Sequence, residues 1–357
     1  MASMENHLLG PVAAKAVAAL GIREGHLVEI RADIAAHQWA EIIAVFVERD
    51  GGIPFLNLAS VQYYKERIVS LPLDQLSTPP PFLVEMSRRV NAIIVVERDW
   101  SQLSRTCPPD KLAAWIKAMG VIVEQLEVRQ VPDCQIVHPD ALPEEHLSVS
   151  REELRRNLES ALIADSNKIQ ARAEYMASRL ALHRQLEIFS GDSRRLAVQF
   201  EGRPIRKGDG KLHEDRVVNF PYGSVYFTLI EDSVEGSIYF EKWQDVDGLV
   251  LSFQQGRLCE VKADRNVHHF EKLLAAHTGD KDRVSHIGIG VNPGLSVYTG
   301  HIALDECRAG SVFLALGENR YLGGTNASTL NLDLVSQKAT VKEPNGALVV
   351  DGKLMLG

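Results

Sequence analysis

The stretch that decides the fold runs Arg283-Val-Ser-His-Ile-Gly-Ile-Gly-Val-Asn-Pro293. Four shorter pieces follow it in order: Leu304-Asp-Glu306, Ala315-Leu-Gly317, Gly323-Gly-Thr-Asn326 and Asn331-Leu-Asp333. Aliphatic runs in this part of the chain end in Gly, Pro or Asn, which is typical of strands closed by tight turns. The sequence therefore predicts polar side chains held on rigid strands.

We expect strands at residues 284–291, 312–316 and 330–335 from these runs. Side chains alternate between the two faces of a strand. Asn331 and Asp333 should therefore share one face of the last strand, with the flanking leucines on the other.

The order of these pieces resembles the C-terminal domain of the M29 metallo-aminopeptidases and of their fold relatives, the Fe(II)-dependent 2,5-dihydroxypyridine dioxygenases. An earlier piece, Asn219-Phe-Pro-Tyr-Gly-Ser224, looks like the Asn-x-Pro-x-Gly-Glu motif of that family. Residues 231–236 look like the Gly-closed hairpin that follows the motif. The resemblance covers about residues 215–335, and the N-terminal half matches only in general style.

The resemblance implies a metal site, but most ligand positions of the aminopeptidases are changed in this chain. Ser224 and His286 stand where the family has metal-binding glutamates, and Phe313 and Asn331 stand where it has histidines. Asp333 alone keeps its identity. A two-metal peptidase needs several carboxylate and imidazole ligands, so we do not expect aminopeptidase activity, although a divergent metallo-aminopeptidase is kept as an alternative.

The dioxygenase branch of the family is closer at the ligand positions. By resemblance it also has a histidine at the position of His286, an aspartate at that of Asp333 and an apolar residue at that of Phe313. Mononuclear Fe(II) oxygenases use two histidines and one carboxylate, and here the second histidine is replaced by Asn331. Three residues are candidates for completing such a site: His213, Glu214 and His301.

Three functions follow from this comparison. The first is a non-catalytic or repurposed member without a cofactor, which binds a peptide or a small aromatic ligand in a biosynthetic or catabolic pathway. The second is a non-haem, ring-cleaving Fe(II) dioxygenase in which His286 and Asp333 are metal ligands, and the third is the divergent aminopeptidase. In the first function, the ligand would contact Tyr222, Ser224, Tyr226, Phe313, Arg320, Tyr321 and Asn331.

Composition narrows the partners of the chain. It has 357 residues, 45% of them hydrophobic, which is enough for two domains with their own cores. The formal net charge of -8 argues against nucleic acid as a partner. The four cysteines form no CxxC pair and suit the cytoplasm. The apolar run at residues 12–20 is too short to cross a membrane. By resemblance we expect a homo-oligomer, specifically a dimer.

We expect an α/β plus β-rich fold with two domains. Residues 1–150 should form an N-terminal α/β layer and residues 151–190 a helical connection. Residues 191–357 should form an M29-like domain of mixed sheet and helices that carries the former metal cleft.

Local patterns place individual elements. Residues 10–20 should form a helix that opens with Pro11, and residues 53–58 and 92–96 should form strands. Residues 152–189 should be helical, with a break near Ser166.

One further group of side chains follows the apolar run at residues 92–96: Glu97, Arg98, Asp99 and Trp100. They are candidate site residues, because open α/β sheets bind ligands at the carboxyl ends of their strands. The chain has no GxGxxG after its first strand and no GKS or GKT loop, so a nucleotide-binding domain has little support.

Overall fold

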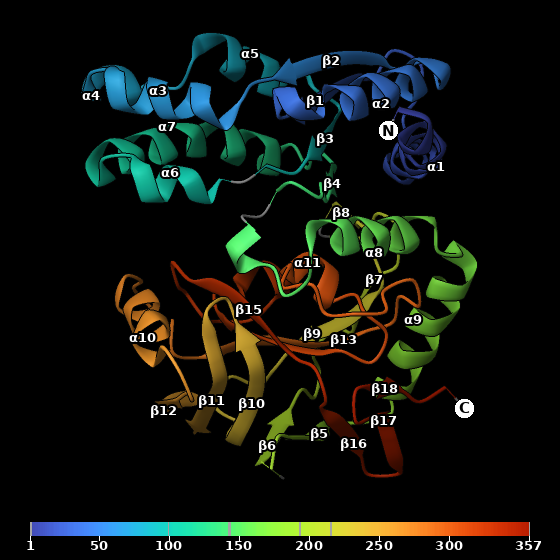
Figure 1. The fold of residues 1–357 in the computed structure, drawn as a ribbon, viewed down its shortest axis with the longest axis vertical. Coiled ribbons are helices and arrows are strands. Elements are labelled where there is room, and N and C mark those ends of the chain that lie inside the picture. The colour runs from blue at the N-terminus through green and yellow to red at the C-terminus, as the bar shows by residue number, and fades with distance from the viewer. Residues whose placement is uncertain (1, 99, 142–143, 193, 215, 357) are drawn as a thin grey trace. The chain divides into compact units, whose positions relative to one another are not determined.

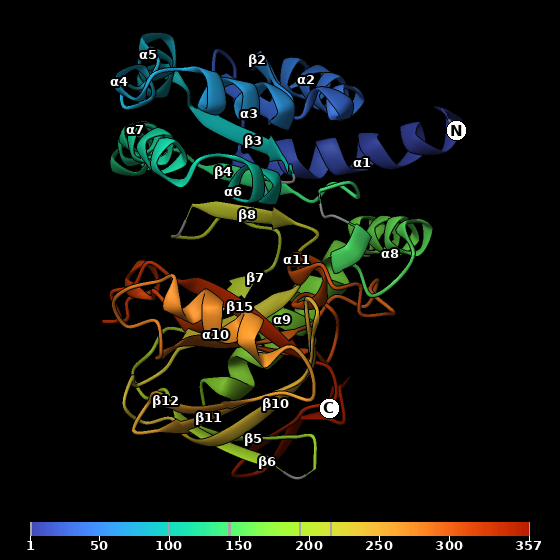
Figure 2. The same ribbon diagram turned by 60° about the vertical axis from the view of Figure 1, so that its left-hand side comes forward.

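This computed structural model describes residues 2–98, 100–141, 144–192, 194–214 and 216–356. The chain folds into two compact units, which we describe separately (Figures 1 and 2). The first unit comprises residues 1–143 and 211–220, and the second comprises residues 144–210 and 221–357.

The first unit is built around a five-stranded parallel sheet, sheet A, with the order β2-β1-β3-β4-β8. Its strands are β1 (Leu27–Ala32), β2 (Ile53–Leu58), β3 (Ala92–Val96), β4 (Asp133–Ile136) and β8 (Val217–Phe220). Its helices are α1 (Ala2–Leu20), η1 (Ile34–Ala36), α2 (His37–Arg49), α3 (Val61–Ser70), α4 (Leu73–Leu76), α5 (Pro81–Arg89), α6 (Ser101–Thr106) and α7 (Pro109–Val128).

The central strands β1 and β3 of sheet A have buried side chains on both faces, as in parallel sheets generally. Val28, Ile30 and Ile94 on one face are inaccessible to solvent. On the other face Ile93 packs with Ile122 of α7 and with α5. Helix α1 packs on α2, and α7 packs on α3, α4, α5 and α6.

The predicted strands at residues 53–58 and 92–96 are confirmed to the residue. The predicted start of the first helix is wrong, because α1 begins at Ala2 and contains Pro11 in its interior. Proline removes a single backbone donor, and here the helix continues through it. The helix ends as expected before Gly21, which has a φ of 60°.

The second unit contains two sheets. Sheet B has eight strands in the order β12-β11-β10-β6-β5-β16-β17-β18, and sheet C has five in the order β15-β14-β13-β9-β7. The strands of sheet B are β5 (Gln185–Ser190), β6 (Arg194–Gln199), β10 (Glu235–Trp243), β11 (Val246–Gln254), β12 (Arg257–Lys262), β16 (Thr340–Glu343), β17 (Gly346–Val350) and β18 (Lys353–Leu354). Those of sheet C are β7 (Arg206–Gly208), β9 (Ser224–Thr228), β13 (Val284–Gly290), β14 (Val312–Gly317) and β15 (Asn331–Ser336).

Within the second unit, sheet C lies between sheet B and a layer that contains α8 and α11, as both views show (Figures 1 and 2). The helices are η2 (Glu144–His146), α8 (Arg151–Ile163), α9 (Ser166–Leu180), α10 (Val267–Ala275), α11 (Ile302–Asp305) and η3 (Arg320–Leu322). Phe227 of β9 packs against Phe200, which follows β6, with ring centroids 4.4 Å apart and the rings tilted. The apolar face of sheet C therefore packs on sheet B, and its polar face is turned away.

The predicted helical region at residues 152–189 is correct only in part. Helices α8 and α9 are separated at Asp165, whose side chain caps α9, so the expected break is confirmed. Residues 185–190 form strand β5 instead of helix. Leu186 and Ile188 are buried in alternation there, and burial in sheet B outweighs the weak local preference for helix.

Candidate functional site

The candidate site lies on the polar face of sheet C, where neighbouring strands bring distant residues together. In the strand register, His286 pairs with Thr228 and Gly288 pairs with Tyr226. Gly288 also pairs with Phe313 on its other side. Paired residues of antiparallel strands project from the same face, so one face combines side chains from β9, β13, β14 and β15.

A bulge in β13 positions His286. Between the pairs Val284 with Leu316 and Ile287 with Leu314, two residues of β13 oppose the single residue Ala315 of β14. Such a bulge re-aims the side chain beside it. Ala315 in turn pairs with Asp333 of β15.

The short side chain of Ala315 leaves space above it for its two larger neighbours. Nε2 of His286 lies 3.2 Å from Oδ1 of Asp333. The predicted metal ligands therefore do face each other in the fold, and His286 is only 6% exposed.

Ser285 fixes the orientation of the His286 ring. Its hydroxyl donates to the backbone carbonyl of Glu318 at 2.8 Å and lies 3.0 Å from Nδ1 of His286. Because the single hydroxyl proton is used on Glu318, the hydroxyl oxygen can only accept from Nδ1–H. That tautomer leaves Nε2 directed at Asp333.

Asp333 has unused bonding capacity. Its Oδ1 atom is buried and accepts no directed hydrogen bond from the described residues, even though Nε2 of His286 is close. Buried carboxylate oxygens normally have a partner, so this atom is suited to receive an N–H or O–H group or a cation.

Glu306, which follows α11, adds a second carboxyl group to this electrostatic environment. Burial, followed by repulsion from Asp333 and Asp305, raises the pKa of Glu306 to about 8. A nearby positive charge would favour the ionised form of this carboxyl.

Aromatic side chains flank the pair. The rings of Tyr226 and Phe313 lie 6.0 and 5.9 Å from the His286 ring, centroid to centroid. Phe313 lies over Gly288, where a Cβ atom would come within 2.0 Å of its ring. Only glycine allows this approach, so Gly288 fixes the position of the Phe313 ring.

The other predicted contact residues are spread more widely. Tyr321 is half-exposed and reaches Asn331 through a long hydrogen bond of 3.5 Å. Desolvation and the nearby Asp333 carboxylate raise the pKa of Tyr321. Arg320 is exposed and turned to Glu318, with two contacts of 2.8 and 2.9 Å.

Ser224 and Tyr222 differ in their surroundings. Ser224 is buried on the polar face and pairs with Gly290. Tyr222 packs against Gly210 and donates its hydroxyl to Ser166 at 2.7 Å, so its polar group is already engaged by α9.

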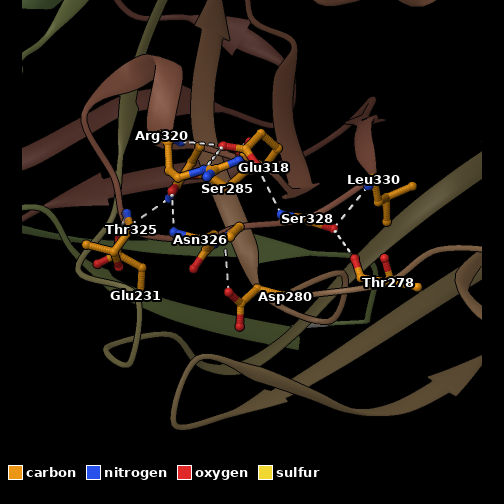
Figure 3. Close-up of polar contacts among 12 residues, drawn as sticks. Glu231, Thr278, Asp280, Ser285, Glu318, Arg320, Thr325, Asn326, Ser328 and Leu330 are labelled. Atoms are coloured by element: carbon orange, nitrogen blue, oxygen red, sulfur yellow. Dashed lines mark hydrogen bonds and ion pairs between the residues drawn. The ribbon is translucent and has the colours of Figure 1, made fainter. Parts of the chain in front are cut away.

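A loop network supports the β13 end of the site (Figure 3). Oε1 of Glu231 accepts from the backbone N–H of Thr325 at 2.8 Å, and Asn326 donates from its side chain to the carbonyl of Val284 at 3.0 Å. Asn319 donates to the carbonyl of Ser285 at 3.2 Å. The Gly-Gly-Thr-Asn piece therefore holds the backbone on which Ser285 and His286 are placed.

Sequence reasoning did not identify Ser285, Ala315 or Glu306 as site residues. All three lie within the quoted pieces, and the only further signal for Ser285 is that it precedes His286. Ala315 had no further signal, because its role depends on two strands that flank it only in the fold.

Comparison with known proteins fits this arrangement. The family model of the thermophilic metalloproteases (M29) matches residues 12–339. The chain belongs to the M29 family. No match was found among curated proteins.

Two solved structures show the M29-like fold over nearly the whole chain. AmpT from Thermus thermophilus has a TM-score of 0.76 at 19% identity, covering 98% of this chain and 100% of AmpT. The 2,5-dihydroxypyridine dioxygenase from Pseudomonas putida KT2440 has a TM-score of 0.64 at 12% identity, covering 99% of this chain and 98% of the dioxygenase. At these identities the likeness is one of fold.

Among the residues that the structure describes, no three His, Cys, Asp or Glu side chains gather into a group that could hold a metal ion. His301 is buried beside α11, and His213 and Glu214 belong to the first unit. His286 and Asp333 supply two donors, one fewer than a mononuclear two-histidine, one-carboxylate site requires.

Within the described ranges, none of the helices combines the length and apolar character needed to cross a bilayer.

Proposed function

We propose that this M29-fold protein has an altered metal site and binds a peptide or small aromatic ligand without a metal cofactor. The observation that carries the proposal is the unsatisfied Oδ1 of Asp333 beside the oriented ring of His286. A ligand N–H or O–H group would give Asp333 the hydrogen bond that it lacks.

The surroundings of the pair suit an aromatic or amine-bearing group. The rings of Tyr226 and Phe313 flank His286, and aromatic rings prefer edge-to-face or offset contacts at such distances. Two carboxyl groups, Asp333 and Glu306, would favour a positively charged or proton-donating end of the ligand. Tyr321 and Asn331 would contact its more exposed part.

A mononuclear Fe(II) oxygenase acting on a hydroxylated aromatic ring is the second candidate. It is favoured by the separation of 3.2 Å between Nε2 and Oδ1. Two ligands at about 2.1 Å from a metal and at right angles to each other would lie about 3.0 Å apart. This candidate requires a third donor besides His286 and Asp333.

Restoring the replaced histidine distinguishes the two candidates. Wild type and Asn331→His are purified without oxygen, incubated with Fe(II) and analysed for iron after desalting. For the binding protein we expect wild type to retain far less than one iron per chain and Asn331→His to approach one, because histidine completes the donor set beside Asp333. The surface variant His268→Ala controls for adventitious uptake.

Ligand binding is measured in parallel with a library of peptides and hydroxylated aromatics, with and without chelator. Binding that survives chelator and is lost in Asp333→Asn supports the proposal. About one iron per wild-type chain, removed by His286→Ala, would replace it with the oxygenase.

A further inference from the structure

The first unit has a topological feature that is independent of the site on sheet C. In sheet A, β1 lies between β2 and β3. The chain therefore goes from β1 to β2 on one side and then returns past β1 to β3 on the other. Open parallel sheets bind ligands beyond the carboxyl ends of their strands, at the point where the strand order reverses. In this sheet that point is at the ends of β1 and β3, near Ala32 and Val96.

An arginine occupies this point. Arg98 follows β3 and is only 7% exposed. Its Nη2 atom donates to the backbone carbonyls of Ala32 and Asn57, at 2.5 and 3.3 Å. Its Nε atom is buried and meets no acceptor among the described residues.

Among the described residues, the guanidinium also has no counter-ion. No acidic side chain in the described part of the chain forms an ion pair with Arg98. Glu29, the buried acid of β1, is shared by Arg31 at 2.8 Å and the Asn57 side chain at 2.7 Å. Asp99 lies outside the described residues. Because buried charges are normally paired, this guanidinium is suited to bind an anion.

The hydrogen bonds to the ends of the neighbouring strands do not by themselves explain why residue 98 is an arginine. The bonds to Ala32 and Asn57 come from one nitrogen, and a lysine or glutamine could supply them. A guanidinium provides five donors in a planar fork that matches a carboxylate. The buried, unsatisfied Nε is the part of the side chain that a purely structural role leaves unused.

Aromatic rings surround the guanidinium. Its Cζ atom lies 5.4 Å from the ring centroid of Trp100 and 5.7 Å from that of Tyr64. Trp115 completes the cluster, 5.7 Å from Tyr64 and 6.2 Å from Trp100. Trp100 is 42% exposed, so it offers an open ring surface beside the cation.

We propose that Arg98 and Trp100 form a second binding site, which takes a small planar organic carboxylate. The carboxylate pairs with the free donors of Arg98, and the planar part packs on the exposed indole of Trp100. Neither contact involves His286 or Asp333, so a test of this site is independent of the proposed function.

Calorimetry on the full chain with benzoate, benzamide and inorganic phosphate tests the site. We expect benzoate to bind with a dissociation constant of about 1 mM or tighter, and benzamide and phosphate to bind at least about tenfold more weakly. Benzamide keeps the ring without the charge, and phosphate keeps the charge without the ring.

Two variants keep the test decisive even if one of them is unstable. Arg98→Met should lower benzoate affinity at least about tenfold. Trp100→Leu changes an exposed side chain and should weaken benzoate several-fold while leaving phosphate unchanged. Tyr63→Leu, an exposed ring next to Tyr64, is the matched control and should bind benzoate as wild type does.

Three results would overturn the proposal. They are absence of benzoate binding at about 10 mM, benzamide binding as tightly as benzoate, and phosphate binding as tightly as benzoate.

Discussion

His286 and Asp333 lie 3.2 Å apart, from Nε2 to Oδ1, although their strands do not pair with each other. Strand β14 lies between β13 and β15. Its residue Ala315 lies opposite the bulge of β13 on one side and opposite Asp333 on the other. The approach of the two functional groups therefore depends on the size of a third side chain that has no polar group of its own.

Enlarging this side chain should separate the pair. In Ala315→Leu we expect the added carbons to push His286 and Asp333 apart and to lower the free energy of unfolding by about 1–3 kcal/mol. Introduced together with Asn331→His, it should abolish the iron uptake expected of that variant, as measured by elemental analysis. In the same Asn331→His background, Ala315→Gly keeps the space open and should retain iron, while lowering the free energy of unfolding by about 1 kcal/mol. Unchanged iron uptake with Ala315→Leu would show that Ala315 does not set the separation of the pair.

Gly288 should be intolerant of a side chain for a different reason. A Cβ atom there would lie 2.0 Å from Cζ of Phe313, which is 2% exposed. We expect Gly288→Ala to destabilise the fold by about 1–3 kcal/mol in urea unfolding. In a double-mutant cycle with Phe313→Leu the cost should fall, and purely additive effects would show that the ring is not the obstacle.

Glu231 should matter as an anchor of the loop at residues 323–326. Burial alone would raise the pKa of Glu231. Hydrogen bonds from the backbone N–H groups of Thr325 and of Glu231 itself, together with the charge of Arg203, outweigh burial, so the pKa is lowered. A lowered pKa means that the ionised group stabilises the fold above its unfolded-state pKa, and that this stabilisation is lost as the pH falls. Glu231→Gln should cost about 1–3 kcal/mol near neutral pH and flatten the acid limb of the stability profile, whereas the exposed Asp232→Asn should change neither.

Asp133 should show the opposite pH dependence. Desolvation raises its pKa to about 6, despite a hydrogen bond from Gln135 and the charge of Arg31. A raised pKa stabilises the fold below the unfolded-state pKa of 3.8, and the contribution is lost as the pH rises through about 6. Asp133→Asn should therefore be more stable than wild type at pH 7, by at most about 3 kcal/mol.

Urea unfolding between about pH 4 and pH 7 measures this difference. The difference between wild type and Asp133→Asn should grow across that range, and Asp110→Asn, at an exposed position of α7, should show no such growth. A difference that is constant with pH would contradict the raised pKa.

Local pattern was sufficient for much of the fold. The runs at residues 53–58 and 92–96 are largely apolar and follow Gly52 and Asn91, and both form strands with the predicted ends. Residues 185–190 were assigned to a helix because a charged helical pattern precedes them. Their alternating burial arises only when β6 and β16 pair with them, so no short window contains that information.

The candidate site was also predictable from the sequence only in part. The alternation at Asn331 and Asp333, together with the family resemblance, selected His286 and Asp333, which do meet. Tyr222 has its hydroxyl engaged by Ser166 of α9, and the roles of Ala315 and Ser285 depend on a bulge in β13. Such contacts depend on strand register and helix docking, for which a single sequence carries no periodic signal.

Strand β8 has a consequence for the synthesis of this protein. Residues 217–220 pair in parallel with β4, yet they are translated only after residues 144–210 of the second unit. On the ribosome, the outer edge of β4 must therefore remain unpaired until the chain has grown by a further eighty or so residues, which follows from the positions of the two strands. Exposed strand edges invite association with other chains, so a fragment ending at residue 143, which lacks β8, should aggregate more readily than the full chain.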